Sequence, residues 1–312
     1  MVIKFFSYTF DVLFEKNVIS SMIRISLKLK QEPYWAIFSA VSILLVGMIA
    51  YKSFSGIVGG LATMDYEMFL WFLLVGFIAQ TIDGALGMAY GVSSNSILLG
   101  IGIPPAVASA WVHFAQVFTS MASGFSHWKL GNVQWPLAKR LMIPGVLGAV
   151  AGAYFLSHID GNTIKPFIAI YLLIMGIIIL TKVIKQKKKL FQPEAKSLPY
   201  LAGIGGFADA IGGGGWGPIV NSTLLGKGQL PRFAIGTGNF VEIFVSLASA
   251  STFLFFIKEL SLAPVLGLIL GGVIAAPFAA VICKKLNPRI LLAFVGLLII
   301  FLSLRTFYLT LY

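Results

Sequence analysis

The chain has 312 residues, of which 58% are hydrophobic and 11% are charged. Soluble domains carry about 25% charged residues, so this composition excludes a soluble enzyme, a disordered protein and a secreted disulfide-bonded scaffold. A net charge of +12 would suggest nucleic-acid binding in a soluble protein. Here the basic residues lie in short clusters between apolar runs, which indicates orientation in a membrane and no nucleic-acid partner.

Residues 1–34 combine aromatic and basic side chains, a pattern typical of an amphipathic helix on the cytoplasmic membrane surface or of a poorly ordered tail. The apolar run 35–51 begins too far from the N-terminus for a signal peptide and predicts a retained spanning helix. The later apolar runs are 68–100, 104–126, 140–157, 165–183, 198–227, 231–257, 262–283 and 289–310. Glycines break two of them, 68–100 and 198–227. We therefore expect an all-α polytopic membrane protein with two broken segments.

The two halves of the chain resemble each other at a constant offset of 126 residues. The aligned pairs include Asp83 with Asp209, Gly91 with Gly217, Asn95-Ser96 with Asn221-Ser222, Pro105 with Pro231 and Gln116 with Glu242. Matches of leucine and glycine alone would be weak in an apolar chain. Matches of Asp, Asn-Ser and Pro at one fixed offset indicate an internal repeat.

The basic residues favour one topology. If the runs 68–100 and 198–227 are re-entrant hairpins and the other runs each cross once, nineteen Lys and Arg residues are cytoplasmic, as are the N-terminus and the central basic loop. The two repeats are then inverted, each a glycine-broken re-entrant hairpin plus three transmembrane helices, after one extra N-terminal helix. The expected divisions are a tail and extra helix at 1–66, a first repeat at 67–186, a basic linker at 187–197 and a second repeat at 198–312.

Three acidic side chains, Asp83, Asp209 and Glu242, lie within the apolar runs. Ionisable groups at membrane depth are costly and commonly mark a proton path or a buried partner. The two aspartates precede the glycine breaks, so proton coupling and capping of exposed backbone N–H groups are equally good interpretations. Glu242, whose aligned residue is Gln116, is slightly preferred for proton coupling; a neutral Glu hydrogen-bonded between helices is the alternative.

The glycine run 212–215 predicts non-helical backbone at membrane depth and a new half-helix after Pro218. Such backbone persists only where protein or a water-filled cavity satisfies it, and its exposed amides attract anions. Close helix packing explains isolated glycines well and four consecutive glycines poorly. The expected substrate-contacting residues are Tyr90, Asn95, Ser96, His113, Gly213, Gly214, Gly215, Trp216, Gly217, Asn221, Ser222, Thr237 and Asn239.

Several of these residues have an ordinary structural interpretation as well. Tyr90 and Trp216, at aligned positions beside the two breaks, would either line or gate a site or simply pack. His113 would carry a proton or bind an anion, although a histidine hydrogen-bonded inside a helix bundle is more common. The sequence contains no metal-ligand set, nucleotide-binding loop or catalytic triad, so no catalytic residue, metal or cofactor is expected.

Each broken run carries a glycine-rich motif. It reads Asp83-Gly84-Ala85-Leu86-Gly87-Met88 in the first half and Asp209-Ala210-Ile211-Gly212-Gly213-Gly214-Gly215-Trp216-Gly217-Pro218 in the second. With the Asn-Ser tracts and the prolines that open the next helix, these motifs resemble the TauE/SafE sulfite exporter family of membrane permeases. The resemblance covers about 68–311 and implies seven to nine helices that transport sulfur-containing anions such as sulfite, sulfoacetate or related organosulfonates.

We therefore expect a secondary transporter of the bacterial inner membrane that exports small sulfur oxyanions, with proton coupling as a candidate driving force. Its partners are the anion and the lipid bilayer, and the sequence permits a homodimer. The alternatives are a passive anion channel and the same fold importing a different sulfur compound. A membrane enzyme is disfavoured because the embedded carboxylates form no recognisable acid–base pair.

Overall fold

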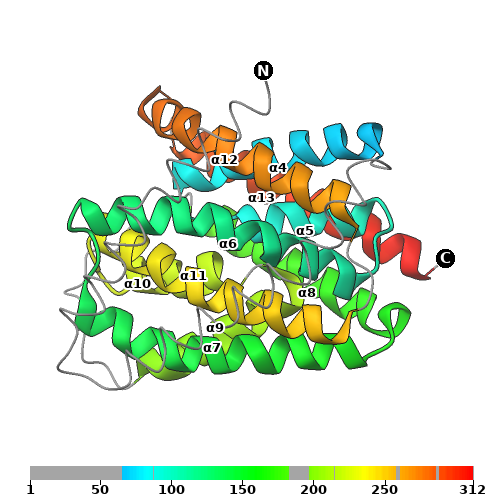
Figure 1. Ribbon diagram of the computed structural model, residues 1–312, viewed down its shortest axis with the longest axis horizontal. Coiled ribbons are helices and arrows are strands. Elements are labelled where there is room, and N and C mark those ends of the chain that lie inside the picture. The colour runs from blue at the N-terminus through cyan, green and yellow to red at the C-terminus, as the bar shows by residue number, and fades with distance from the viewer. Residues whose placement is uncertain are drawn as a thin grey trace. The chain divides into compact units, whose positions relative to one another are not determined.

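The structure is a computed structural model that describes residues 65–86, 88–182, 197–213, 215–257, 261–285 and 288–311. The predicted N-terminal tail, the run 35–51 and most of the basic linker lie outside the described residues. Within them, the chain forms ten α-helices and one short π-helix (Figure 1), which confirms the predicted all-helical class. The elements are α4 (Tyr66–Leu86), α5 (Tyr90–Gly100), α6 (Pro105–Lys129), α7 (Trp135–His158), α8 (Gly161–Lys182), α9 (Ser197–Gly212), η1 (Trp216–Asn221), α10 (Ser222–Gly226), α11 (Pro231–Phe256), α12 (Leu262–Lys285) and α13 (Pro288–Leu311).

Local sequence signals explain many of the helix ends. The helices α6, α11 and α13 begin at a proline, where the first-turn N–H that proline lacks is not needed. At the start of α8, Asp160 Oδ2 accepts hydrogen bonds from the backbone N–H of Thr163 over 2.9 Å and from its hydroxyl over 3.0 Å. These bonds stabilise the ionised carboxylate, so they hold the pKa of Asp160 below its usual value.

The two broken runs divide at the offset seen in the sequence. The run 68–100 forms α4 and α5, and the run 198–227 forms α9, η1 and α10. The helix α5 covers Tyr90–Gly100, and the residues aligned with its ends, Trp216 and Gly226, bound the helical segment made by η1 and α10. The predicted start after Pro218 is wrong, because η1 begins at Trp216. Pro218 lies in the first turn of that helix, which tolerates a missing N–H.

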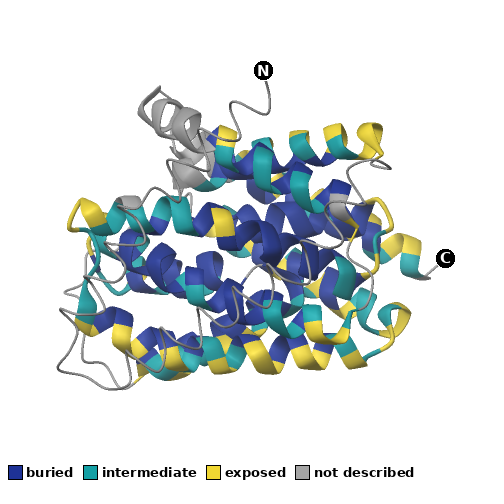
Figure 2. Ribbon diagram, in the orientation of Figure 1, coloured by how far each residue is buried: buried dark blue, intermediate teal, exposed yellow. Residues whose placement is uncertain are grey.

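Five helices of the described part are long and apolar enough to cross a membrane. They differ in burial, because 61% of the span in α11 is buried, against 28–39% in the other four. Large apolar side chains on outer helices are exposed, such as Leu147 on α7, Phe167 on α8 and Phe301 on α13. Figure 2 shows the buried residues gathered on α6 and α11 and the exposed ones on helices such as α7. This distribution is the one expected for central helices surrounded by lipid-facing ones.

The helices pair across the two halves. The main partner of α4 is α12 and the main partner of α9 is α7, while α6 pairs with α11 and α8 with α13. Small residues allow the close approaches. A Cβ on Gly76 of α4 would lie 2.5 Å from the carbonyl oxygen of Leu268 on α12, and a Cβ on Gly152 of α7 would lie 2.5 Å from that of Phe207 on α9. The first helix of each half is thus packed against a helix of the other half.

Candidate functional site

The two broken segments meet backbone to backbone. Gly213 has a φ of +68°, a left-handed conformation that glycine adopts readily, and a Cβ there would lie 2.6 Å from the carbonyl oxygen of Gly91. A Cβ on Gly91 would in turn collide with the carbonyl group of Gly213, and one on Gly217 would lie 2.8 Å from the Cα atom of Met88. The glycines therefore allow each broken segment to cross the other at close range.

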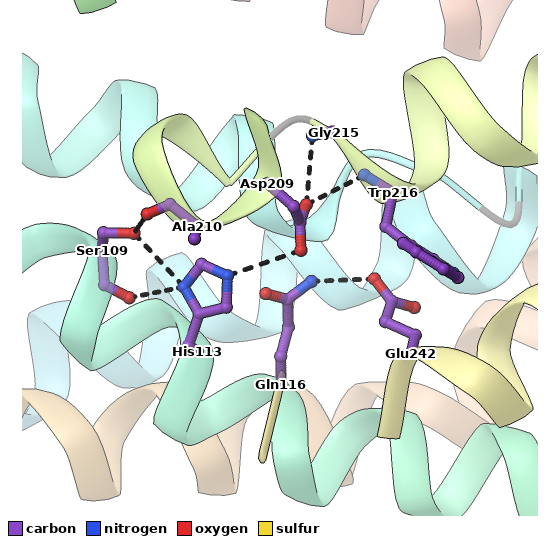
Figure 3. Close-up of polar contacts among 8 residues, drawn as sticks. All are labelled: Ser109, His113, Gln116, Asp209, Ala210, Gly215, Trp216 and Glu242. Atoms are coloured by element: carbon purple, nitrogen blue, oxygen red, sulfur yellow. Dashed lines mark hydrogen bonds and ion pairs between the residues drawn. The ribbon is translucent and has the colours of Figure 1, made fainter. Parts of the chain in front are cut away.

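An aspartate at the end of the preceding helix engages the backbone that each break exposes. Asp209 Oδ1 accepts hydrogen bonds from the N–H of Gly215 over 3.1 Å and of Trp216 over 3.0 Å (Figure 3). At the aligned position of the first half, Asp83 Oδ1 accepts one from the N–H of Tyr90 over 3.2 Å. These are the contacts that a capping carboxylate makes.

A histidine from α6 faces the second oxygen of Asp209. His113 Nε2 lies 3.4 Å from Asp209 Oδ2, and the two side chains are 0% and 1% exposed. On the other side of the ring, His113 Nδ1 lies 2.8 Å from the carbonyl oxygen of Ser109 and 3.2 Å from its hydroxyl oxygen. That hydroxyl donates to the carbonyl oxygen of Ala210 over 2.5 Å (Figure 3). The imidazole is therefore held from both sides.

These contacts fix where one imidazole proton lies. Because a carbonyl oxygen only accepts, His113 Nδ1 carries the proton that it directs at Ser109. His113 Nε2 then faces Asp209 either as an N–H donor to a carboxylate or as an acceptor from a carboxylic acid. The His113–Asp209 pair is a buried pair of titratable groups, and either of its facing atoms can carry one further proton.

A second polar contact joins α6 to α11 in the same cluster. Gln116 Nε2 donates to Glu242 Oε1 over 3.0 Å (Figure 3). Gln116 is buried and Glu242 is partly buried. Gln116 follows His113 by three residues, so the two side chains project from one face of α6. Glu242 therefore has an interhelical partner within the cluster that contains Asp209.

Trp216 is fully buried at the second break. Its indole N–H donates to the carbonyl oxygen of Gly238 on α11 over 2.9 Å. A Cβ on Gly145 of α7 would lie 2.8 Å from the indole ring, and the Asn221 amide packs against Gly238 from the next turn. These contacts fasten the start of η1 to two neighbouring helices, as the packing interpretation of Trp216 requires.

Two predicted contact residues on α11 make their hydrogen bonds elsewhere. The hydroxyl oxygen of Thr237 accepts from the backbone N–H of Gln134, just before α7, over 2.9 Å. Asn239 Nδ2 donates to the hydroxyl oxygen of Ser123, near the end of α6, over 2.7 Å. Neither side chain contacts the His113–Asp209 pair through a hydrogen bond in the described part of the chain. They link the start of α11 to neighbouring segments.

The remaining predicted residues lie on the two broken segments. Asn95 and Ser96 are buried on α5, and their side-chain polar atoms have no hydrogen-bond partner among the described residues. The hydroxyl of Ser222 donates to the carbonyl oxygen of Gly217 over 3.2 Å, and that of Tyr90 donates to the carbonyl oxygen of Leu268 over 3.3 Å. Gly214 lies outside the described residues.

Two residues of the cluster were not predicted from the sequence. Ser109 positions His113 from one turn earlier on α6, and its only sequence signal is the spacing of four residues. Tyr171 of α8 lies against the second break, because a Cβ on Gly212 would lie 2.6 Å from its ring. Nothing in the local sequence of α8 distinguishes Tyr171 from a lipid-facing tyrosine. Among the described residues, no group of three or more His, Cys, Asp or Glu side chains is arranged to hold a metal ion.

Comparison with known proteins places the chain among transporters. The family profile described as sulfite exporter TauE/SafE matches residues 72–306. The chain is 43% identical over 244 residues to the probable membrane transporter protein YtnM of Bacillus subtilis, which covers 75% of this chain and 81% of YtnM. It is 27% identical over 248 residues to the probable membrane transporter protein YdhB of the same organism, covering 75% of this chain and 98% of YdhB.

A shorter match, 31% identical over 94 residues, is to the sulfite exporter TauE/SafE family protein 3 of Arabidopsis thaliana and covers 30% of this chain and 18% of that protein. No solved structure matches the chain significantly. The profile match spans both glycine-rich motifs and most of the described helices. The chain therefore belongs to the TauE/SafE family of membrane transporters, and it is a transporter rather than an enzyme.

Proposed function

We propose that this protein is a secondary transporter that exports small sulfur-containing anions, sulfite or organosulfonates, across the bacterial inner membrane with proton coupling. The observation that carries the proposal is the buried His113–Asp209 pair beside the amides of the second break. An ionisable pair at membrane depth is expected on a transport path. Backbone amides released by a broken helix supply hydrogen-bond donors for an anion without a buried lysine or arginine.

The proposed architecture is two inverted repeats, 67–186 and 198–312, each with a glycine-broken re-entrant hairpin and three transmembrane helices. The pairing of helices across the two halves supports this architecture. The helix α4 of the first half packs on α12 of the second half, and its aligned helix α9 of the second half packs on α7 of the first half. Breaks that cross at Gly91 and Gly213 are what two hairpins meeting near the midplane would give. We place the N-terminus and the basic linker 187–197 in the cytoplasm.

The proposed anion contacts are the amides of residues 213–217 together with polar side chains on the broken segments. Asn95 and Ser96 support this assignment, since their buried polar atoms have no protein partner among the described residues and would hydrogen-bond to a ligand. The contacts of Thr237 and Asn239 favour a supporting role for these two residues.

Sulfite flux into or out of proteoliposomes under an imposed pH gradient tests the proposal. We expect wild-type flux to follow the gradient, and we expect one of the variants Asp83→Asn, Asp209→Asn or Glu242→Gln to abolish that dependence. Flux in every variant that ignores the gradient would indicate a passive anion channel. A preferred flux in the opposite direction would indicate import, and an absence of sulfite and sulfonate flux would contradict the proposed substrate class.

A further inference from the structure

The carboxylate of Asp209 is surrounded as a bound oxyanion would be. Oδ1 accepts from the N–H groups of Gly215 and Trp216, and Oδ2 faces Nε2 of His113. Two backbone amides and an imidazole thus converge on one carboxyl group (Figure 3). Gly215, Trp216 and His113, which carry these donors, are all buried, so water does not compete for the hydrogen bonds.

We propose that Asp209 is a tethered occupant of the substrate anion site, and that a sulfur oxyanion replaces it at these three donors only when Asp209 takes up a proton. This inference rests on the proposed function. A sulfonate or sulfite presents several oxygens around one sulfur atom, so its oxygens suit the same amides and the same imidazole N–H. The carboxylate and the anion would then alternate at a single set of donors.

Charge requires that the exchange include a proton. An ionised Asp209 displaced by an anion would remain within a few ångströms of it, and two like charges repel strongly in a buried site. If Asp209 takes a proton as it leaves, the acid form is neutral and His113 keeps the proton on Nε2 for the incoming anion. One proton and one monoanion enter the site together, so its net charge does not change.

Two other carboxyl groups and a tyrosine near Asp209 bear on whether an anion can enter the site without a proton. Asp83 from α4 and Glu242 from α11 interact with it electrostatically, and Tyr171 approaches from α8. Wherever these two carboxyl groups are ionised, their negative charge disfavours a further anion unless a proton accompanies it. The described parts of α7 and α5 approach this region through the glycines Gly152 and Gly91.

The first half lacks an equivalent set of donors. Asp83 accepts from one amide, that of Tyr90. The residue aligned with His113 is Asn239, whose amide donates to Ser123 rather than to Asp83. The donor set with an imidazole is therefore confined to the second break, and the inference assigns the exchange to Asp209 alone.

The test measures anion binding by purified protein in detergent with ethanesulfonate, which stays a monoanion across the pH range in which the protein is folded. Titration calorimetry in buffers of different ionisation enthalpy gives affinity and proton uptake together. For the wild type we expect uptake of one proton per anion and an affinity that falls about tenfold for each pH unit once Asp209 is ionised. For the double variant His113→Gln/Asp209→Asn, which leaves an amide N–H in place of the imidazole and no titratable group at these donors, we expect binding that does not vary with pH and takes up no proton. Asp83→Asn should keep the wild-type slope.

The outcomes separate the two proposals. Binding to the wild type without proton uptake would overturn the exchange at Asp209, whether or not the variant folds. A folded double variant that keeps the pH dependence, or that binds no anion while the wild type does, would overturn it as well. If neither ethanesulfonate nor sulfite binds to the folded wild type or to the folded double variant, the proposed substrate class fails, and the exchange fails with it.

Discussion

Gln116 donates a hydrogen bond to Glu242 over 3.0 Å, and the two residues are separated by the same 126 positions that relate the two halves of the chain. Aligned residues touch in this way only where an element packs against its own counterpart. The helices α6 and α11 form such a pair at the centre of the described bundle. An ionisable carboxyl group on one side and an amide that does not titrate on the other make this contact chemically asymmetric.

Replacement of Glu242 by Gln should preserve proton uptake during anion binding. The new side chain keeps an oxygen that accepts from Gln116, and the His113–Asp209 pair is unchanged. Calorimetry with ethanesulfonate in two buffers measures the uptake. Loss of proton uptake in this variant, with affinity retained, would move the coupling proton to Glu242, the carboxylate that the sequence favours for this role.

Replacement of Gly91 by Ala should destabilise the protein by about 1–3 kcal/mol or more, because the added Cβ collides with the backbone of Gly213 and overpacks the crossing of the two breaks. Thermal unfolding in detergent measures the change. Gly226→Ala is the matched control, since no atom lies within 4 Å of the Cβ it would add. Equal stability of the two variants would contradict a tight crossing at Gly91.

Replacement of Trp216 by Phe should cost about 1–3 kcal/mol, because it removes the indole N–H and leaves the buried carbonyl of Gly238 without that donor. Trp111→Phe is the comparison, since the indole N–H of Trp111 has no partner among the described residues. That variant loses buried ring volume but no hydrogen bond, so it should cost less than Trp216→Phe. The midpoint of thermal unfolding distinguishes the two variants. An identical loss of stability in both would mean that only the size of the ring matters.

Replacement of Arg305 by Met should lower stability by about 1 kcal/mol or less. Arg305 on α13 donates from Nη1 to the carbonyl oxygen of Gly100, the last residue of α5, where a cation favours the negative end of the helix dipole. Arg305→Lys should retain part of the effect. Thermal unfolding at low and high salt provides the measurement. If the loss of stability in Arg305→Met is the same at both salt concentrations, the contribution of Arg305 is not electrostatic.

The helices and their breaks were predictable because hydropathy and glycine act locally. The run 68–100 was expected to break, and it divides into α4 and α5. The start of η1 was placed too late because Pro218 was taken to precede the half-helix, whereas it lies in the first turn. The last residues of α5 and α10, Gly100 and Gly226, are aligned at the repeat offset, and similar local sequence precedes both.

The pairing of His113 with Asp209 was not predictable from the sequence. Repeat alignment relates Asp209 to Asp83 and His113 to Asn239, so it gives no reason to bring His113 and Asp209 together. Their contact depends on α6 passing the end of α9, which is a property of tertiary packing. Thr237 was expected at the site because of its helix, but the direction of its side chain is set by Gln134.

The exchanged pairing of α4 with α12 and of α9 with α7 has a consequence for biosynthesis. The helix α4 is made early, but its main partner α12 is made only near the end of translation, so the face of α4 that packs on α12 stays uncovered until then. A chain cut after α8 would leave that face of α4 without its partner permanently.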